Sequence, residues 1–295
     1  MDLLIKKGFH VTVVDDLSAK TDLRYLKSHI ENGTATFSKT DVRDYDKLME
    51  LDSDFEYVFH LAAQADVKLS VSDPRFDFEV NILGTFNILE FMRKKEISKL
   101  IFASSLGTVY GEPEIYPTPE NYQLKPISNY GAAKAAAEMY CSSYSSLYGI
   151  DIVSLRLGNI YGPRSTHGVM FDFYNKLKKD PSNLEILGDG SQTKTYLHIN
   201  DTINAFDVTH TKMKKGFDVY NVSSDEQTTV KQVAINMLEA LGLEEVNFTF
   251  TGGKRGWKGD VVFTSVDTLK LQSLGWDAKI SIEEGIVDYV KWLNQ

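Results

Sequence analysis

The chain has 295 residues, of which 42% are hydrophobic and 25% are charged, and its formal net charge at pH 7 is −9. A chain of this size can bury one large core or two modest ones, and its acidic balance argues against nucleic acid as a partner. The single cysteine, Cys141, excludes an internal disulfide framework and a cysteine metal cluster, so no metal site is expected. No stretch approaches about 18 apolar residues and no signal-peptide pattern is present, so we expect no membrane association and a reducing, cytoplasmic compartment.

The first half of the chain alternates between strand and helix patterns. Residues 1–7 are typical of the last turns of a helix that ends at Gly8. Strands are expected, in chain order, at 10–14, 35–38, 56–63, 99–103 and 151–157. Helices are expected at 45–51, 78–95 and 130–148. This alternation predicts an α/β fold with a doubly wound parallel sheet, and the nearly continuous apolar run at 56–63 is typical of such a sheet.

Beyond residue 157 the alternation loosens. Loops rich in glycine are expected at 158–164 and 252–260. Further strands are expected at 184–187, 219–222 and 247–251. Further helices are expected at 169–179, 200–211, 229–241, 266–273 and 281–293. We expect most of this half to form a smaller lid, built from two insertions and the C-terminal tail.

The stretch with the clearest chemistry follows the expected strand 99–103, which runs into two serines, the second of them Ser105. Tyr130 and Lys134 then stand four residues apart, a spacing that places both on one face of the expected helix. A phenol has a pKa of about 10, and it becomes a useful base near neutral pH when a fixed ammonium lowers that pKa. Two exposed helix residues would show the same spacing by chance, but the preceding strand end favours a catalytic group.

Polar and small residues follow two other expected strands. Asp15 follows strand 10–14, and a carboxylate at the end of a buried parallel strand is the usual partner of an adenosine ribose. A loop or helix-cap aspartate is an equally good interpretation of this segment alone. Ala62 and Ala63 would let a ligand approach the backbone closely, and Asn81 is either a solvated helix residue or a cofactor contact.

Eight short motifs occur in one order along the chain: Val14-Asp-Asp-Leu-Ser18, Asp41-Val-Arg-Asp44, His60-Leu-Ala-Ala-Gln64, Asn81-Ile-Leu-Gly-Thr85, Ser104-Ser105…Val109-Tyr110-Gly111, Tyr130-x-x-x-Lys134, Arg156-Leu-Gly-Asn-Ile-Tyr-Gly-Pro-Arg164 and Gly188-Asp-Gly-Ser-Gln-Thr193. Each motif is weak alone. In this order and spacing, the chain resembles the extended short-chain dehydrogenase/reductase superfamily. Within that superfamily it is most similar to the NAD-dependent nucleotide-sugar epimerase/dehydratase family, of the UDP-glucose 4-epimerase type.

The resemblance implies NAD as the cofactor and a nucleotide-diphosphate sugar as the substrate. The residues that it implies for NAD binding are Asp15, Asp16, Ser18, Asp41, Val42, Leu61, Ala62, Ala63, Asn81, Tyr130 and Lys134. Those that it implies for substrate binding are Ser105, Thr108, Asn159, Lys194, Arg255 and Lys258. The catalytic residues would be Ser105, Tyr130 and Lys134, with Tyr130 as the acid/base and Lys134 as the ribose-binding residue that lowers its pKa.

The implied reaction is epimerisation at C4 of a sugar such as UDP-glucose, UDP-galactose or an N-acetyl analogue, through a transient 4-keto sugar. Tyr130 would take the proton of the 4-hydroxyl, and Ser105 would hydrogen-bond that hydroxyl, while hydride transfer belongs to the cofactor. The expected division is a dinucleotide-binding domain over 1–158, to which 196–222 return, and a substrate-binding lid over 159–195 and 223–295.

The family also implies a homodimer, in which helices 78–95 and 130–148 pair with their copies. The apolar residues of these helices are equally compatible with the core of a monomer. Their periodicity does not separate the two interpretations.

The chain departs from the family pattern at its start. The family begins with a strand and a Gly-x-x-Gly-x-x-Gly turn whose backbone binds the pyrophosphate, and neither occurs here. Because that strand is central in the order 3-2-1-4-5-6, we expect a Rossmann-type sheet without its first strand, in which two interior strands stand about 9–10 Å apart with unpaired backbone groups between them. The full gene product is expected to carry roughly 15–25 further residues upstream, and NAD binding by this chain alone is expected to be impaired.

Smaller departures bear on the reaction. Leu106 and Gly107 stand where dehydratases of the family carry an Asp-Glu pair, which argues against 4,6-dehydration. Lys194 stands where an arginine is usual, so the phosphate clamp loses a bidentate donor. A nucleotide-sugar decarboxylase or dehydratase is one alternative, and it would need further acidic or arginine groups around Ser105. A non-catalytic nucleotide-sugar or NAD-binding homologue is another, suggested by the missing glycine turn, although the joint presence of the three catalytic residues argues against it.

Overall fold

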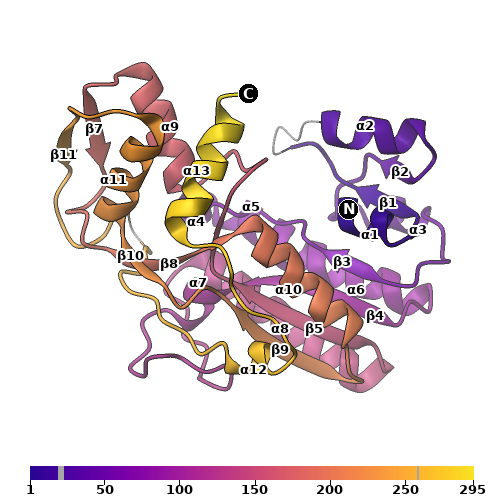
Figure 1. Ribbon diagram of the computed structural model, residues 1–295. Coiled ribbons are helices and arrows are strands. Elements are labelled where there is room, and N and C mark those ends of the chain that lie inside the picture. The colour runs from indigo at the N-terminus through magenta and orange to yellow at the C-terminus, as the bar shows by residue number, and fades with distance from the viewer. Residues whose placement is uncertain (19–22, 258) are drawn as a thin grey trace.

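A computed structural model of the chain describes residues 1–18, 23–257 and 259–295 (Figure 1). Its main sheet has four parallel strands, which explains the long apolar runs of the sequence. In sheet order these are β3 (Val58–His60), β4 (Lys99–Ser105), β5 (Asp151–Leu157) and β9 (Phe217–Val222). The predicted parallel sheet is therefore confirmed. The strand predicted at 56–63 is shorter, because β3 spans only Val58–His60.

The sheet is divided. A second, two-stranded parallel sheet holds β1 (Val11–Val14) and β2 (Ala35–Ser38), with Val11 opposite Ala35. Among the described residues, β1 pairs only with β2 and β3 pairs only with β4. Within the described residues, β1, β2 and β3 therefore each leave one backbone edge without a strand partner.

Helices cover both faces of the main sheet, because alternate side chains of each strand point to opposite sides. Leu100 and Phe102 of β4 pack in one apolar cluster with α6 (Gly84–Lys94) and α8 (Asn129–Tyr148). Ile101, between them, packs on the other side with α10 (Ile199–Thr211). The doubly wound arrangement follows from this alternation.

The segment between β1 and β4 contains more helix than the sequence predicts. Its helices are α2 (Arg24–Glu31), α3 (Tyr45–Met49), α4 (Val67–Ser72), α5 (Pro74–Phe78) and the π-helical turn η1 (Glu79–Leu83), which runs into α6. The predicted helix 78–95 is therefore only the end of a longer helical run. The Asp73-Pro74 pair starts α5: the Asp73 side chain accepts a hydrogen bond from the backbone N–H of Phe76, and proline occupies the first turn.

The other elements lie together on the left of Figure 1, around their own apolar core. They comprise a three-stranded sheet of β10 (Gln227–Thr229), β8 (Thr193–His198) and β6 (Asn159–Tyr161), a parallel pair of β7 (Asn183–Ile186) and β11 (Asn247–Phe250), and the helices α9 (Val169–Lys179), α11 (Val230–Leu241) and α13 (Ile282–Leu293). The predicted loop 158–164 is wrong in part, because it contains β6. The predicted helix 266–273 is reduced to α12 (Leu269–Gln272).

Two short features complete the chain. Helix α1 (Asp2–Lys6) precedes β1, and α7 (Leu106–Tyr110) follows β4 without an intervening loop. Within the described residues, no helix has the length and apolar character needed to cross a lipid bilayer.

Candidate active site

Several of the predicted cofactor and catalytic residues follow the carboxyl ends of parallel strands. Parallel strands end at the same edge of a sheet, and ligands of open α/β sheets bind outside these carboxyl ends. Asp15 and Asp16 follow β1, Leu61 follows β3, and Ser105 ends β4. Because β3 and β4 are neighbours in one sheet, the topology brings together Leu61 and Ser105, which are 44 positions apart in the sequence.

Ser105, Thr108 and Tyr130 form one hydrogen-bonded group. Ser105 is both the last residue of β4 and the N-cap of α7, so Thr108 lies one turn above it. The Thr108 hydroxyl donates to Ser105 Oγ at 2.7 Å. A further hydrogen bond joins Ser105 to the Tyr130 phenol. The structure thus brings together the predicted acid/base and both predicted hydroxyl groups.

A close helix contact fixes Tyr130 in this group. The Ser128 hydroxyl oxygen accepts a hydrogen bond from the Gly131 N–H at 3.1 Å and thereby starts α8. A Cβ atom on Gly131 would lie 2.2 Å from the carbonyl oxygen of Thr108. Only glycine allows α8 to approach α7 so closely, and this approach carries the neighbouring Tyr130 toward Ser105.

The predicted lowering of the Tyr130 pKa by Lys134 is not found. Burial raises the pKa of Tyr130 to about 12, the hydrogen bond with Ser105 acts in the opposite direction, and the charge of Asp77 raises it further. The Lys134 ammonium donates instead to the carbonyl oxygen of Ala103 at 2.9 Å and lies over the Phe102 ring. Burial therefore outweighs the expected charge effect, and Tyr130 is a neutral phenol at pH 7 in this structure.

Lys134 is buried, with 3% of its surface exposed. Burial lowers its pKa to about 8, while interactions with Asp77, Cys141 and Glu138 favour its protonated form. Lys134 remains mostly charged at neutral pH. An ammonium held this far inside the protein is well placed to bind hydroxyl or anionic groups at the strand edge.

Asp77 is a site residue that the sequence analysis missed. It lies in α5 and is almost fully buried, and its carboxylate accepts hydrogen bonds from Gln64 Nε2 at 2.9 Å and Asn81 Nδ2 at 3.0 Å. Burial raises its pKa, and the two amide donors and the Lys134 charge act against that rise. The signal was available, since an acidic residue between Phe76 and Phe78 in an apolar helix pattern is unusual.

Asn81 organises the loop after β3. Its side-chain oxygen accepts from the Gln64 backbone N–H, and its amide donates to the Gln64 carbonyl oxygen. Leu61, the residue directly after β3, is 58% exposed, and the small side chains of Ala62 and Ala63 follow it. The loop thus offers an accessible apolar surface at the strand edge, as predicted for a segment that a ligand approaches.

The predicted residues after β1 form tight turns. Asp15 Oδ1 accepts the Leu17 N–H at 2.7 Å, and Asp16 Oδ1 accepts both the N–H and the hydroxyl of Ser18. These contacts turn the chain directly after the strand. Leu17 itself has a positive φ of 64°, a conformation that the two flanking Asx-type turns hold in place.

After β2, Asp41 binds Arg43 through both carboxylate oxygens, and this hydrogen bonding lowers the Asp41 pKa. Val42 packs against Gly84, where an added Cβ would lie 2.6 Å from Val42 Cγ2. Asp41 and Val42 therefore hold the carboxyl end of β2 against α6. The structure does not bring Asp41 into the hydrogen-bonded group of Ser105.

The predicted substrate residues of the lid lie around Asp260. Lys194 forms an ion pair with the buried Asp260 carboxylate at 2.6 Å, and Arg255 donates to the Asp260 carbonyl oxygen and to Glu112. Lys258 lies outside the described residues. Asn159 instead donates to the Thr195 carbonyl oxygen and ties β6 to β8.

Gly259, in the segment that follows β11, reaches the start of α8. A Cβ atom on Gly259 would lie 3.3 Å from the Ser128 Cβ, next to the N-cap of α8. The ring of Trp257, which the sequence analysis did not single out, has the ammonium groups of Lys68 and Lys194 each 4.9 Å from its centroid. Within the described residues, the segment that carries Arg255 and the Lys194 partner Asp260 is thus connected to the start of α8 through Gly259 rather than through a contact of the two cationic side chains.

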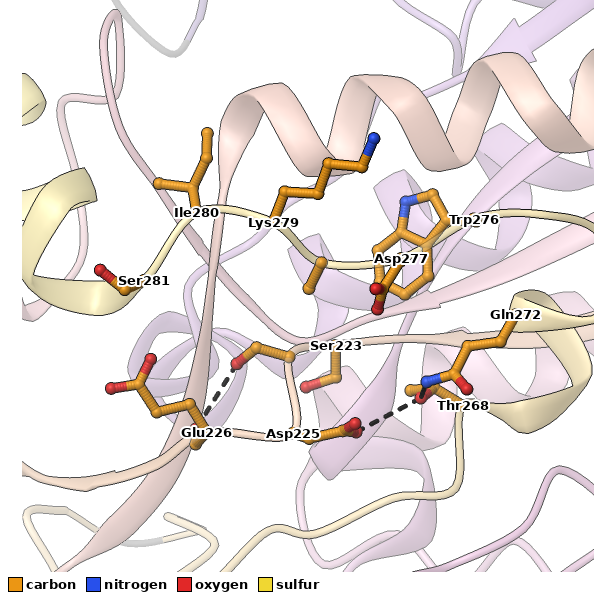
Figure 2. Close-up of a pocket in the computed structure, with 12 residues that line it drawn as sticks. Ser223, Asp225, Glu226, Thr268, Gln272, Trp276, Asp277, Lys279, Ile280 and Ser281 are labelled. Carbon is orange, nitrogen blue, oxygen red and sulfur yellow. Dashed lines mark hydrogen bonds between the residues drawn. The ribbon is translucent and has the colours of Figure 1, made fainter.

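A cavity of about 300 Å³ lies elsewhere, between the end of β9, α12 and the chain before α13 (Figure 2). None of the predicted site residues lines it. Its polar walls bind one another: Thr268 donates to Asp225, and Glu226 accepts the Ile282 N–H at the start of α13. This cavity is a separate feature of the fold rather than part of the Ser105 group.

Comparisons with known proteins agree with this arrangement. The model of the NAD dependent epimerase/dehydratase family matches residues 1–223. A putative UDP-glucose 4-epimerase of Methanocaldococcus jannaschii is 35% identical and covers 100% of this chain and 93% of its own length. The crystal structure of Thermotoga maritima UDP-glucose 4-epimerase with UDP-glucose has a TM-score of 0.90 and 34% identity, over 99% of this chain and 93% of that one. The Thermus thermophilus UDP-glucose 4-epimerase in complex with NAD has a TM-score of 0.87 and 35% identity, over 99% and 94%.

Proposed function

Because this chain belongs to the NAD-dependent epimerase/dehydratase family, we propose that it epimerises a nucleotide-diphosphate sugar at C4 through a transient 4-keto sugar. The observation that carries the proposal is the hydrogen-bonded group of Ser105, Thr108 and Tyr130, with the buried Lys134 one turn along α8. UDP-glucose and UDP-galactose, or their N-acetyl analogues, are the proposed substrates.

The carboxyl edge fits NAD in two respects. The Lys134 ammonium makes one hydrogen bond within the described residues, to Ala103, so that two of its N–H bonds are left for ribose hydroxyls. The exposed Leu61 and the small Ala62 and Ala63 leave room for a flat ring beside the backbone. Asp15 and Asp16 would hold the adenosine end. NAD, when bound, supplies the oxidation and reduction of C4 by accepting and returning a hydride.

The chain's own residues handle the proton of the sugar 4-hydroxyl. Thr108 donates to Ser105 Oγ, so the Ser105 proton is free to be shared with the phenol or with the sugar hydroxyl. Tyr130 must give up its own proton before it can accept one, and its raised pKa opposes this in the present structure. We propose that the Lys134 charge favours the phenolate once substrate and cofactor fill the edge.

The lid is proposed to bind the nucleotide diphosphate. Lys194 and Arg255 are the cationic groups proposed for this role, and in the structure they bind the Asp260 carboxylate and the Asp260 carbonyl oxygen. The proposed division is as follows: residues 1–158 and 196–222 hold the cofactor, and residues 159–195 and 223–295 hold the substrate. Asn159, at their junction, would contact the diphosphate.

We also propose that the protein acts as a homodimer through α6 and α8. These helices lie side by side, with the Phe86 ring 5.9 Å from that of Tyr140. Large apolar side chains on this side of α8 are exposed, among them Met139 at 57% and Leu147 at 68%. A second copy would cover them, and sedimentation of the wild type against Met139→Glu tests this: a monomer in both samples contradicts the proposal.

The direct test of the reaction incubates the protein with NAD+ and UDP-galactose and follows the anomeric signals of the sugar by proton NMR. We expect UDP-glucose to form with the wild type, and Tyr130→Phe to abolish its formation while leaving substrate binding intact. Appearance of a 4-keto-6-deoxy sugar would favour a dehydratase, and release of carbon dioxide in a parallel assay with UDP-glucuronate would favour a decarboxylase. Binding without turnover would favour a non-catalytic homologue. The dehydratase outcome is not expected, because the positions after Ser105 are the buried Leu106 and Gly107.

A further inference from the structure

A charged network is buried directly behind the proposed acid/base group. Glu138 of α8 is fully buried and Arg156 of β5 is 4% exposed, and the guanidinium binds both carboxylate oxygens at 2.7–3.2 Å. Two charges taken out of water are a weak means of stabilising a fold, because their desolvation offsets much of their attraction. Since this ion pair adds little net stability, its position next to the proposed site points to a role in the geometry of that site.

Glu138 lies on the same face of α8 as the proposed catalytic residues. It stands four residues after Lys134 and eight after Tyr130, and residues at these spacings align along one side of a helix. Its Oε1 accepts a hydrogen bond from the Ser104 hydroxyl at 2.5 Å. Ser104 is the residue before Ser105, so one hydrogen bond ties α8 to the end of β4 that carries the substrate hydroxyl partner.

The network continues to the segments that frame the site. Arg156 donates to the Tyr110 phenol oxygen at 2.6 Å and to the Glu120 carbonyl oxygen at 2.9 Å. Tyr110 ends α7, the helix that carries Thr108, and its hydroxyl donates to Asn221 of β9 at 2.8 Å. Every element that holds the Ser105 group is thus bound to the same ion pair.

We propose that Glu138 is a positioning residue, which fixes the start of α8 against the end of β4 so that the acid/base group keeps its geometry. This inference rests on the proposed function for its catalytic consequence. Glu138 itself touches no reacting atom. It acts through Ser104, which sets the strand end, and through Arg156, which sets α7.

Two serine variants test the proposal as a matched pair. Ser104→Ala and Ser154→Ala each remove one hydroxyl from a buried residue of the main sheet. The Ser104 hydroxyl binds Glu138, whereas the Ser154 hydroxyl has no hydrogen-bond partner in the described part of the chain. We expect Ser104→Ala to lower kcat about tenfold with an unchanged KM, and Ser154→Ala to change neither. KM should stay unchanged because Lys194 and Arg255, proposed to bind the nucleotide diphosphate, make no hydrogen bond to this network among the residues that the structure describes.

A spectroscopic measurement separates this proposal from the proposed reaction. In protein labelled with 13C at the tyrosine ring carbon that bears oxygen, the Tyr130 signal is the one that Tyr130→Phe removes. We expect Ser104→Ala to shift this signal and its titration midpoint, and Ser154→Ala to leave both unchanged. If the wild type turns over no sugar, the proposed reaction fails, and the tyrosine signal still decides the positioning role.

Equal responses of the two alanine variants would overturn the proposal. If Ser104→Ala does not fold, Tyr110→Phe tests the same chain of hydrogen bonds from its other end, since it removes only the hydroxyl that binds Arg156 and Asn221. The Tyr130 signal is then expected to shift in Tyr110→Phe, and an unshifted signal overturns the proposal.

Discussion

The buried ammonium of Lys134 finds its hydrogen-bond acceptor in the backbone carbonyl of Ala103, at 2.9 Å, and not in the phenol of Tyr130. A neutral carbonyl compensates only part of the free energy needed to bury a charge. Burial of Lys134, the residue proposed to bind the cofactor ribose, therefore lowers the free energy of unfolding.

The first prediction is that Lys134→Met stabilises the folded protein while it abolishes turnover. Burial lowers the Lys134 pKa from 10.5 to about 8, which corresponds to about 3 kcal/mol in the free energy of unfolding at pH 7. Between pH 8 and 10.5 the unfolded chain binds more protons than the folded one at this position. Wild-type stability should therefore rise with pH across that window relative to Lys134→Met, as urea unfolding at pH 7 and 9.5 can measure. Lys27→Met, on the exposed face of α2, is the control; a less stable Lys134→Met at pH 7 contradicts the assignment.

The second prediction concerns Gly131. A Cβ atom there would lie 2.2 Å from the Thr108 carbonyl oxygen, so Gly131→Ala must push α8 away from α7. We expect a loss of roughly 1–2 kcal/mol in unfolding free energy, since overpacking outweighs the better helix propensity of alanine. The loss of kcat should be larger, at least about tenfold, because Tyr130 moves with the helix. Ala132→Ser, next in the helix but exposed, should change neither quantity. Full activity of Gly131→Ala would show that the helix contact does not set the geometry.

The third prediction is that His60 stays neutral in the folded protein far below pH 6. Its Nε2 lies 3.0 Å from Thr85 Oγ1, whose own proton goes to the Asn81 carbonyl oxygen, so the ring must donate. Burial lowers the His60 pKa to about 3. As the pH falls from 6.5 toward 3, only the unfolded chain gains this proton, and the folded state loses stability. Nitrogen-15 NMR of the ring at pH 4.5 should show the neutral form with the proton on Nε2; a midpoint above pH 5 would falsify the assignment.

The fourth prediction is that Asp77→Asn shifts the alkaline limb of the activity profile. The Asp77 charge favours protonated Lys134, so its removal should lower the Lys134 pKa and move the loss of activity to lower pH. Both amide donors bind the same oxygen, Asp77 Oδ1, so the asparagine oxygen can keep the two hydrogen bonds but without their charge-assisted strength, and stability should fall by about 1 kcal/mol. The pH dependence of kcat and a melting curve measure the two effects. Asp46→Asn, on exposed α3, serves as the control, and an unchanged alkaline limb in Asp77→Asn argues against the charge coupling.

Much of the fold could be predicted because its causes are local. Apolar runs such as 99–103 and 151–157 identify buried parallel strands, and their alternation with amphipathic helices indicates a doubly wound sheet. The spacing of Tyr130 and Lys134 identifies the helix face that meets Ser105, because a helical period is fixed by geometry. The order of short motifs adds the family.

The features of the site that could not be predicted from the sequence depend on contacts between distant segments. The direction of the Lys134 ammonium is set by a carbonyl at the end of another strand, and the Tyr130 pKa by how deeply α7 and α8 bury it. Asp77 carries no motif, and its importance emerges only when α5 packs against α8. The ion pair between Lys194 and Asp260 likewise joins residues that are 66 positions apart in the sequence.

The division of the parallel sheet has a consequence for the order in which the molecule opens. β1 and β2 share hydrogen bonds only with each other among the described strands, whereas β4 and β5 are paired on both edges. Cooperative units of a protein open with free energies that follow their burial and pairing, so β1–β2 should exchange its amide hydrogens as an independent unit before the main sheet does. Asp15 and Asp16, the residues proposed to hold the adenosine, belong to that unit. Binding of the adenosine would therefore suppress the local opening of β1–β2. The opening of β4 and α8, which hold the proposed catalytic residues, would not change.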